Sequence, residues 1–192
     1  MSLATGCQAP PITVIGIGNP YRHDDAAGLV VLASLSQRFA AEQRIRLVEL
    51  DGEPVRLIQS WEGSDTVLII DAVRSLHPPG TIHHFRADGI SGAAADGIAL
   101  GGGHLLGLGE AIDLARALCL LPRDLDVVGI EGADFELGQG LSAPVASACD
   151  LATAQLVDQL EQLLLSLVSR SGAAARPAAR RCWPLAECGR ND

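Results

Sequence analysis

Residues 12–28 read ITVIGIGNPYRHDDAAG, and this stretch decides the fold. It begins with a short run of apolar and β-branched residues, passes through a glycine-containing turn, and enters a mostly apolar segment that extends to Phe39. The pattern predicts a strand over 12–17, then a loop, then a helix over 25–39. The third glycine of a dinucleotide-binding G-x-G-x-x-G turn would fall on Tyr21, so we do not expect a dinucleotide site here.

The same alternation of strand and helix continues along the chain. We expect further strands over 45–50, 66–70, 81–85 and 126–130, and helices over 54–61, 104–120 and from Ser142 to about 167. Because the early strands are apolar throughout and do not alternate, they suit a parallel sheet that is covered on both faces. The sequence therefore predicts an α/β fold, a three-layer sandwich with a largely parallel, doubly wound sheet.

The composition indicates one folded domain followed by a tail. Of the 192 residues, 48% are apolar and 19% are charged, which is enough apolar material for a core. We expect residues 1–169 to form a single α/β domain and residues 170–192, rich in Arg and Ala, to be a disordered tail. A Gly- and Ala-rich segment over 86–103 lacks periodicity and predicts a long loop of the kind that often carries function.

The charged residues exclude several classes of function. All 14 basic residues are Arg, and the formal net charge is −9. Without lysine the chain cannot use a phosphate-loop lysine or form a Schiff base, and its acidity disfavours a nucleic-acid partner. No apolar run approaches the ~18–20 residues of a membrane helix, so we expect a cytoplasmic protein with no membrane contact. For a chain of this size the default expectation is a monomer.

Acidic residues follow three of the predicted strands. Asp24 and Asp25 come after the first strand, Asp51 after the second and Asp71 after the third. At one edge of a parallel sheet these carboxylates would repel one another unless a cation or a proton lay among them. His104 would add a nitrogen ligand, and such a set suits nickel or zinc. The alternative is structural: Asp24 and Asp25 favour a helix N-terminus, and Asp71 caps a turn.

The remaining histidines and cysteines carry weaker signals. We expect His23 to be a solvated loop residue, and at most one of His83 and His84 to face a site, because neighbouring side chains in a strand point to opposite faces. Cys119 and Cys149 fall on helical apolar stripes and are expected in the core. The five cysteines include no C-x-x-C pair, and the chain contains neither G-x-S-x-G nor H-E-x-x-H.

Residues 16–28 resemble the N-terminal signature of the hydrogenase maturation endopeptidases, which trim the C-terminal extension from the large subunit of nickel-iron hydrogenases. Further matches follow in the order typical of that family: LDG at 50–52, IDA at 70–72, PGT at 79–81, HLLGL at 104–108, and more weakly VGI at 128–130 with GLS at 140–142. The resemblance covers residues 12 to about 167.

The resemblance implies that Asp25, Asp71 and His104 contact a metal ion. In this family that metal is thought to be the nickel already inserted in the substrate, so nickel would arrive with the precursor and would not be a permanent cofactor. Asp25 stands where the family commonly has Glu, which keeps the charge and shortens the side chain by one methylene. The resemblance further implies that Gly18 and Asn19 position the substrate.

We therefore predict an endopeptidase that removes the C-terminal extension of a nickel-loaded hydrogenase large-subunit precursor. Asp51, which the resemblance implies to lie near the scissile bond, is the candidate general base. The alternative is a non-catalytic nickel-binding chaperone or a flavodoxin-like binding module, and an aromatic content of 3% argues against flavin. The tail with Cys182 and Cys188 has no counterpart that the resemblance explains.

Overall fold

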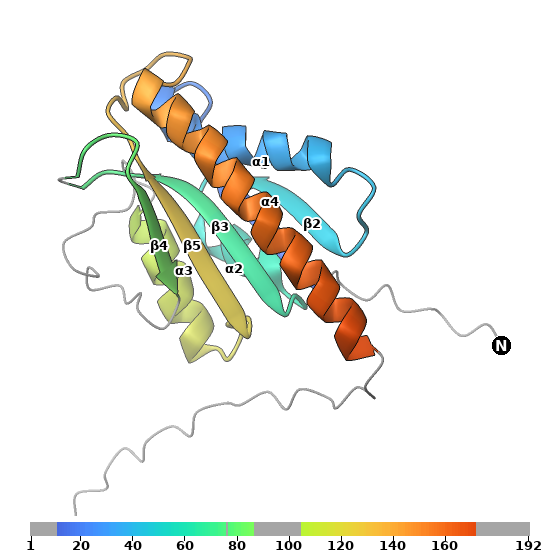
Figure 1. Cartoon of the computed structure of the whole chain (residues 1–192). Helices are drawn as coiled ribbons and strands as arrows, with labels where there is room; N and C mark the ends of the chain where they lie inside the picture. Colours follow the sequence, from blue (N-terminus) through green and yellow to red (C-terminus); the bar gives the residue numbers. More distant parts are fainter. Residues whose placement is uncertain (1–10, 76, 87–104, 172–192) are drawn as a thin grey trace, which may run out of the picture.

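The computed structural model describes residues 11–75, 77–86 and 105–171. A five-stranded sheet lies between two pairs of helices (Figure 1). The strands are β1 (Ile12–Ile17), β2 (Ile45–Leu50), β3 (Thr66–Val73), β4 (Ile82–Arg86) and β5 (Asp124–Glu131). The helices are α1 (Ala27–Arg38), α2 (Pro54–Trp61), α3 (Leu105–Ala117) and α4 (Ala143–Ser171), and a short 3-10 helix, η1 (His23–Ala26), precedes α1.

The sheet has the strand order β2-β1-β3-β5-β4. The first four strands in this order are parallel, and β4 pairs antiparallel with β5 at the edge. The predicted largely parallel sheet is confirmed. The direction of β4 follows from the short link between Val73 and Ile82, because a parallel return needs a crossover of about a dozen residues.

Two apolar clusters, one on each face of the sheet, make the three predicted layers. Helices α1 and α4 cover one face, where Val14 and Leu68 lie, and α2 and α3 cover the other, where Ile15 and Ile69 lie. Adjacent residues of a strand thus belong to opposite clusters, as the alternation of side chains requires. This explains why β1 and β3 are apolar throughout, since both of their faces are buried.

The start of α2 shows how local sequence fixes an element. The Glu53 carboxylate accepts hydrogen bonds from the backbone N–H groups of Val55 and Arg56, at 3.1 and 2.8 Å. Pro54 occupies the first helical turn, where its missing N–H costs no hydrogen bond. The carboxylate also compensates the positive end of the helix dipole. The predicted bounds of this helix are confirmed.

Several element boundaries differ from the predicted ones. Strand β3 continues to Val73, beyond the predicted end at residue 70, because β5 pairs with it as far as Glu131. Helix α4 ends at Ser171, and residues 172–192 of the predicted tail lie outside the described residues. The predicted loop over 86–103 also lies outside them, apart from Arg86, which belongs to β4. None of the described helices is long and apolar enough to cross a membrane.

Candidate active site

Two glycines bring Asp25 against the ends of the central strands. A Cβ at Gly18 would overlap the carbonyl oxygen of Asp25, and a Cβ at Gly28 would overlap the carbonyl oxygens of Ile17 and Ile70. Only glycine therefore allows the η1 turn and the start of α1 to lie this close to β1 and β3. The predicted tight turn is confirmed, and its consequence is that Asp25 is buried beside the carboxyl ends of the two strands.

Asp25 and Asp71 form a buried pair of carboxylic groups at this edge of the sheet. Each is about 1% exposed. Burial, and then the nearby negative charge of Asp25, raise the pKa of Asp71 well above its usual range, although the backbone N–H of Ala72 acts in the opposite direction. Among the described residues, no hydrogen bond of regular geometry reaches either carboxylate oxygen of Asp71. Because little solvent screens these two buried groups, the repulsion between their charged forms is strong.

A buried pair of this kind suits a divalent cation. A buried carboxylate oxygen without a hydrogen bond of regular geometry, as in Asp71, is costly in a protein interior, and a cation beside it would supply a favourable interaction and offset the repulsion from Asp25. Oxygen ligands from Asp25 and Asp71, supplemented by an imidazole, match the requirements of borderline ions such as nickel or zinc. The described residues supply the two carboxylates of this ligand set, whereas its predicted imidazole, His104, lies outside them.

Asp24, next in sequence to Asp25, has a different role. Its Oδ2 accepts hydrogen bonds from the backbone N–H groups of Ala133 and Asp134 at 2.8 and 2.9 Å, and from Ser142 Oγ at 2.9 Å. Its Oδ1 accepts one from the Ser142 N–H at 2.6 Å. Burial raises the pKa of Asp24, but these hydrogen bonds outweigh burial and hold the pKa below its usual value. Asp24 therefore ties η1 to the segment between β5 and α4.

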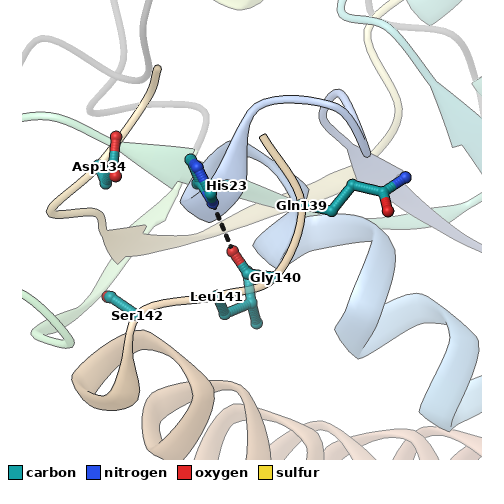
Figure 2. Close-up of a pocket in the computed structure, with 6 residues that line it drawn as sticks. All are labelled: His23, Asp134, Gln139, Gly140, Leu141 and Ser142. Atoms are coloured by element: carbon teal, nitrogen blue, oxygen red, sulfur yellow. Dashed lines mark hydrogen bonds between the residues drawn. The ribbon is translucent and has the colours of Figure 1, made fainter. Parts of the chain in front are cut away.

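A hollow lies beside this junction, at the loops that follow β1 and β5 (Figure 2). It is lined by His23, Asp134, Gln139, Gly140, Leu141 and Ser142. The His23 ring points toward the 138–142 segment, and its Nδ1 lies 3.1 Å from the carbonyl oxygen of Gly140. The prediction that His23 is merely solvated is therefore incomplete, because the ring also packs over Gly138, where a Cβ would overlap it.

The other predicted site residues lie outside the buried pair. Asp51 follows β2 at the surface, with its side chain 59% exposed, and its Oδ2 lies 3.1 Å from Arg56 Nη1. The four carboxylates at the strand ends thus do not form one buried cluster, because β2 is an edge strand open to solvent. Asn19 is half-buried, and its Oδ1 accepts a hydrogen bond from the Tyr21 N–H at 3.0 Å. His104 lies outside the described residues.

Cys149 and the two adjacent histidines of β4 behave as their patterns predict. The Cys149 thiol is buried in the core. Burial, and to a lesser extent the negative charges of Asp150 and Asp24, raise its pKa to about 12. His83 is mostly buried, whereas His84 on the opposite face is exposed. The prediction that Cys119 lies in the core is wrong, because α3 ends at Ala117 and leaves Cys119 half-buried just beyond the helix.

Sequence reasoning missed the hydrogen bonds made by Asp24 and the side-chain partner of Ser142. Ser142 does precede α4, as predicted, but its hydroxyl donates to Asp24. From two consecutive acids at a helix start, the sequence does not show which carboxylate accepts hydrogen bonds and which one is buried beside another carboxylate. That distinction depends on the 133–142 segment, more than a hundred residues away in sequence.

Comparison with known proteins identifies the family. The family model described as hydrogenase maturation protease matches residues 29–159. The hydrogenase 2 maturation protease of Escherichia coli K12 is 27% identical over 167 residues, which cover 86% of this chain and 95% of that protein. The hydrogenase expression/formation protein HoxM of Azotobacter vinelandii is 27% identical over 172 residues, which cover 88% and 82% respectively.

Solved structures give the same result. The E. coli hydrogenase maturating endopeptidase HybD superposes with a TM-score of 0.67 and 26% identity, covering 79% of this chain and 92% of that one. HybD from Thermococcus kodakarensis superposes with a TM-score of 0.65 and 25% identity, covering 78% and 97%. The chain therefore belongs to the hydrogenase maturation protease family and is an endopeptidase of hydrogenase maturation. This decides against the non-catalytic alternatives, the chaperone and the flavodoxin-like module.

Proposed function

We propose that this endopeptidase removes a C-terminal extension from the large-subunit precursor of a nickel-iron hydrogenase after nickel has been inserted. The observation that carries the proposal is the buried pair formed by Asp25 and Asp71. Two carboxylates buried side by side repel one another unless a proton or a cation lies between them. A cation brought by the substrate would turn that repulsion into binding energy.

In this proposal Asp25 and Asp71 recognise the nickel-bearing part of the precursor, together with His104. Both carboxylates are held by rigid elements, because Asp71 lies within β3 and Asp25 is fixed by the η1 turn. Such rigidity favours recognition of a metal at a defined position in the substrate. Nickel, when the precursor carries it, would polarise a neighbouring carbonyl or water.

Gly18 and Asn19 form the proposed substrate-positioning segment. Asn19 uses its side-chain oxygen to hold the turn through the Tyr21 N–H, which leaves its amide nitrogen as a donor toward a peptide. Gly18 follows β1 directly, and its N–H is bonded to Leu50 of β2 at 3.2 Å. The segment is therefore fixed between the end of β1 and η1, where an extended peptide could lie against backbone groups.

Asp51 remains the proposed general base. It lies at the carboxyl end of β2, next to the positioning segment through the Gly18–Leu50 hydrogen bond. Its exposed carboxylate can accept a proton from water, and Arg56 holds its orientation. Asp51→Asn should lower kcat by about 100-fold while binding of the nickel-loaded precursor is retained. Unchanged kcat in this variant would remove Asp51 from the chemistry.

The decisive experiment compares nickel-loaded with nickel-free precursor. The purified protein should shorten only the loaded large subunit, and the mass of the product, measured by mass spectrometry, gives the bond that is cut. Asp71→Asn and His104→Ala should each abolish the cut, whereas the exposed Asp158→Asn should leave it unchanged. Cleavage of nickel-free precursor at the same rate would contradict the proposed role of the metal.

We place the reaction in the cytoplasm and propose that the enzyme is a monomer. The buried Cys149 is a free thiol, in keeping with a reducing compartment. Cell fractionation followed by size-exclusion chromatography with light scattering tests both statements. Recovery in the membrane fraction, or a mass near twice 20.0 kDa, would contradict them.

A further inference from the structure

A second group of potential metal ligands lies on β4, β5 and the segment between β3 and β4. His77, His83 and Glu131 each offer one ligand atom, and these atoms all lie within 4.8 Å of one another. Within the described residues, these three side chains are close enough together to hold one metal ion. The catalytic proposal uses none of the three.

The sheet places this cluster apart from the Asp25–Asp71 pair. Asp71 of β3 is opposite Gly129 of β5, which in turn is opposite His83 of β4. The three residues form one row across the sheet, so His83 lies two strands, or about 10 Å, from Asp71. Glu131 lies two residues beyond Gly129 on β5 and therefore points to the same face. One ion cannot contact both groups, because ligand distances are about 2 Å.

Glu131 is a buried carboxylate with remaining capacity to accept. It is 1% exposed, and it accepts hydrogen bonds from the Ser75 N–H at 2.5 Å and from Ser75 Oγ at 2.7 Å. Its Oε2 lies 3.4 Å from His83 Nε2. A carboxylate has about four acceptor positions, and neutral donors alone compensate poorly for burying its charge. A positive group beside Oε2 is therefore favoured.

Ser75 fixes the tautomer of His77. The Ser75 hydroxyl has one proton, and it donates this proton to Glu131, which as a carboxylate only accepts. The contact of 2.8 Å between Ser75 Oγ and His77 Nδ1 therefore requires the ring nitrogen to be the donor. With the proton on Nδ1, the Nε2 of neutral His77 carries a lone pair. Hydrogen-bonded orientation of this kind is what surrounding residues provide for histidines that bind metals.

Ring packing and the turn before β4 hold His83 and Glu131 in place, whereas His77 can adjust. The His77 and His83 rings contact edge to face with centroids 4.8 Å apart, and Phe85 stacks on His83 with centroids 6.0 Å apart. The backbone of Glu131 binds the turn before β4, through Gly80 N–H and Thr81 O at 2.7 and 2.9 Å. His77 is exposed and can rotate, which allows the ligand atoms to close toward the spacing of about 3.4 Å that a tetrahedral ion requires.

We propose that His77, His83 and Glu131 form a binding site for a borderline divalent transition-metal ion of the zinc and nickel class, separate from the Asp25–Asp71 pair. Two imidazole nitrogens and one carboxylate oxygen are a ligand set that zinc uses in proteins, with further positions open to water. Imidazole equally suits nickel, whereas calcium and magnesium prefer oxygen ligands. The site does not depend on the proposed proteolytic reaction.

The test uses the full chain and zinc alone as the probe. Two competing sites are removed first: the accessible cysteines are alkylated, and Asp71→Asn weakens the carboxylate pair. After treatment with a chelator, calorimetric titration with zinc should show one saturable site. His83→Gln and His77→Gln should each weaken zinc binding at least about tenfold. His84→Gln is the matched control, because His84 lies on the opposite, exposed face of β4. This variant should bind zinc with the same affinity as the alkylated Asp71→Asn protein that lacks the histidine substitutions.

Two further results decide the proposal. In NMR spectra of the same protein, zinc should shift the imidazole C–H signals of His77 and His83 and leave those of His23 and His84 in place. Thermal melts without metal establish that the variants are folded, and His77→Gln alters an exposed side chain. No saturable zinc binding in the parent, or equal affinity in folded His83→Gln, would overturn the proposal and leave a hydrogen-bonded His83–Glu131 contact only.

Discussion

At the scale of single residues, Asp24 and Asp25 show how neighbouring carboxylates take on different roles. Asp24 is buried and accepts four hydrogen bonds, three of them from the backbone of residues 133–142. In Asp24→Asn one oxygen becomes an NH₂ donor that faces other donors, so we expect the free energy of unfolding to fall by about 2–4 kcal/mol. Urea unfolding measures this loss, and Asp158→Asn, at an exposed position of α4, is the control.

The loss should depend on pH with a defined sign. The folded-state pKa of Asp24 lies below its ordinary value of 3.8, so its carboxylate stabilises the protein above that pH and loses this effect as pH falls through the folded pKa. The difference in unfolding free energy between the unmodified protein and Asp24→Asn should therefore have its largest value near pH 6 and decrease below about pH 4. A difference that stays constant to pH 2.5 would contradict a charged Asp24.

Asp71 should behave in the opposite way. Its carboxyl group is buried beside Asp25, and its pKa is raised, so the charged form opposes folding at neutral pH. Asn has nearly the same shape, and its NH₂ can donate to Asp25. We expect Asp71→Asn to raise the free energy of unfolding by about 1 kcal/mol or more while the enzyme loses activity. Urea unfolding at pH 7 checks the sign, and a destabilised variant would show that Asp71 serves the fold.

At the scale of elements, Gly28 sets the distance between α1 and the sheet. Helix propensity alone predicts that Gly28→Ala stabilises α1 by about 1 kcal/mol. The structure predicts the reverse, because the new Cβ would overlap the carbonyl oxygens of Ile17 and Ile70. We expect a net loss of about 1–3 kcal/mol in unfolding free energy. The exposed Ala33→Gly in the same helix is the converse control and should lose about 1 kcal/mol from propensity alone.

The elements also show what the sequence can and cannot predict. Strand β1 and helix α2 have the predicted bounds, because a run of apolar residues and a Glu-Pro helix start are local signals. The antiparallel direction of β4 and the extension of β3 past Asp71 depend on pairing with β5, which periodicity does not encode. The burial of Asp25 beside Asp71 followed from the rule for strand ends. The exposure of Asp51 did not, since it depends on β2 being an edge strand.

At the scale of the whole molecule, stability should be distributed according to the position of each strand in the sheet. The inner strands β1 and β3 are buried over almost all of their length, whereas the edge strands β2 and β4 are half-exposed. Amide hydrogens of buried central strands exchange with solvent only through global unfolding, and those at sheet edges also exchange through local opening.

Hydrogen exchange followed by mass spectrometry should therefore give a defined order. Amides of β1 and β3 should be the slowest, with an opening free energy equal to that from urea unfolding, and amides of β4 should exchange faster. Zinc provides a further comparison, because an ion that joins His83 of β4 to Glu131 of β5 would slow exchange in β4 and leave β2 unchanged. Amides of β4 that are as slow as those of β1 without metal would contradict this order and would place the edge strand in the global folding unit.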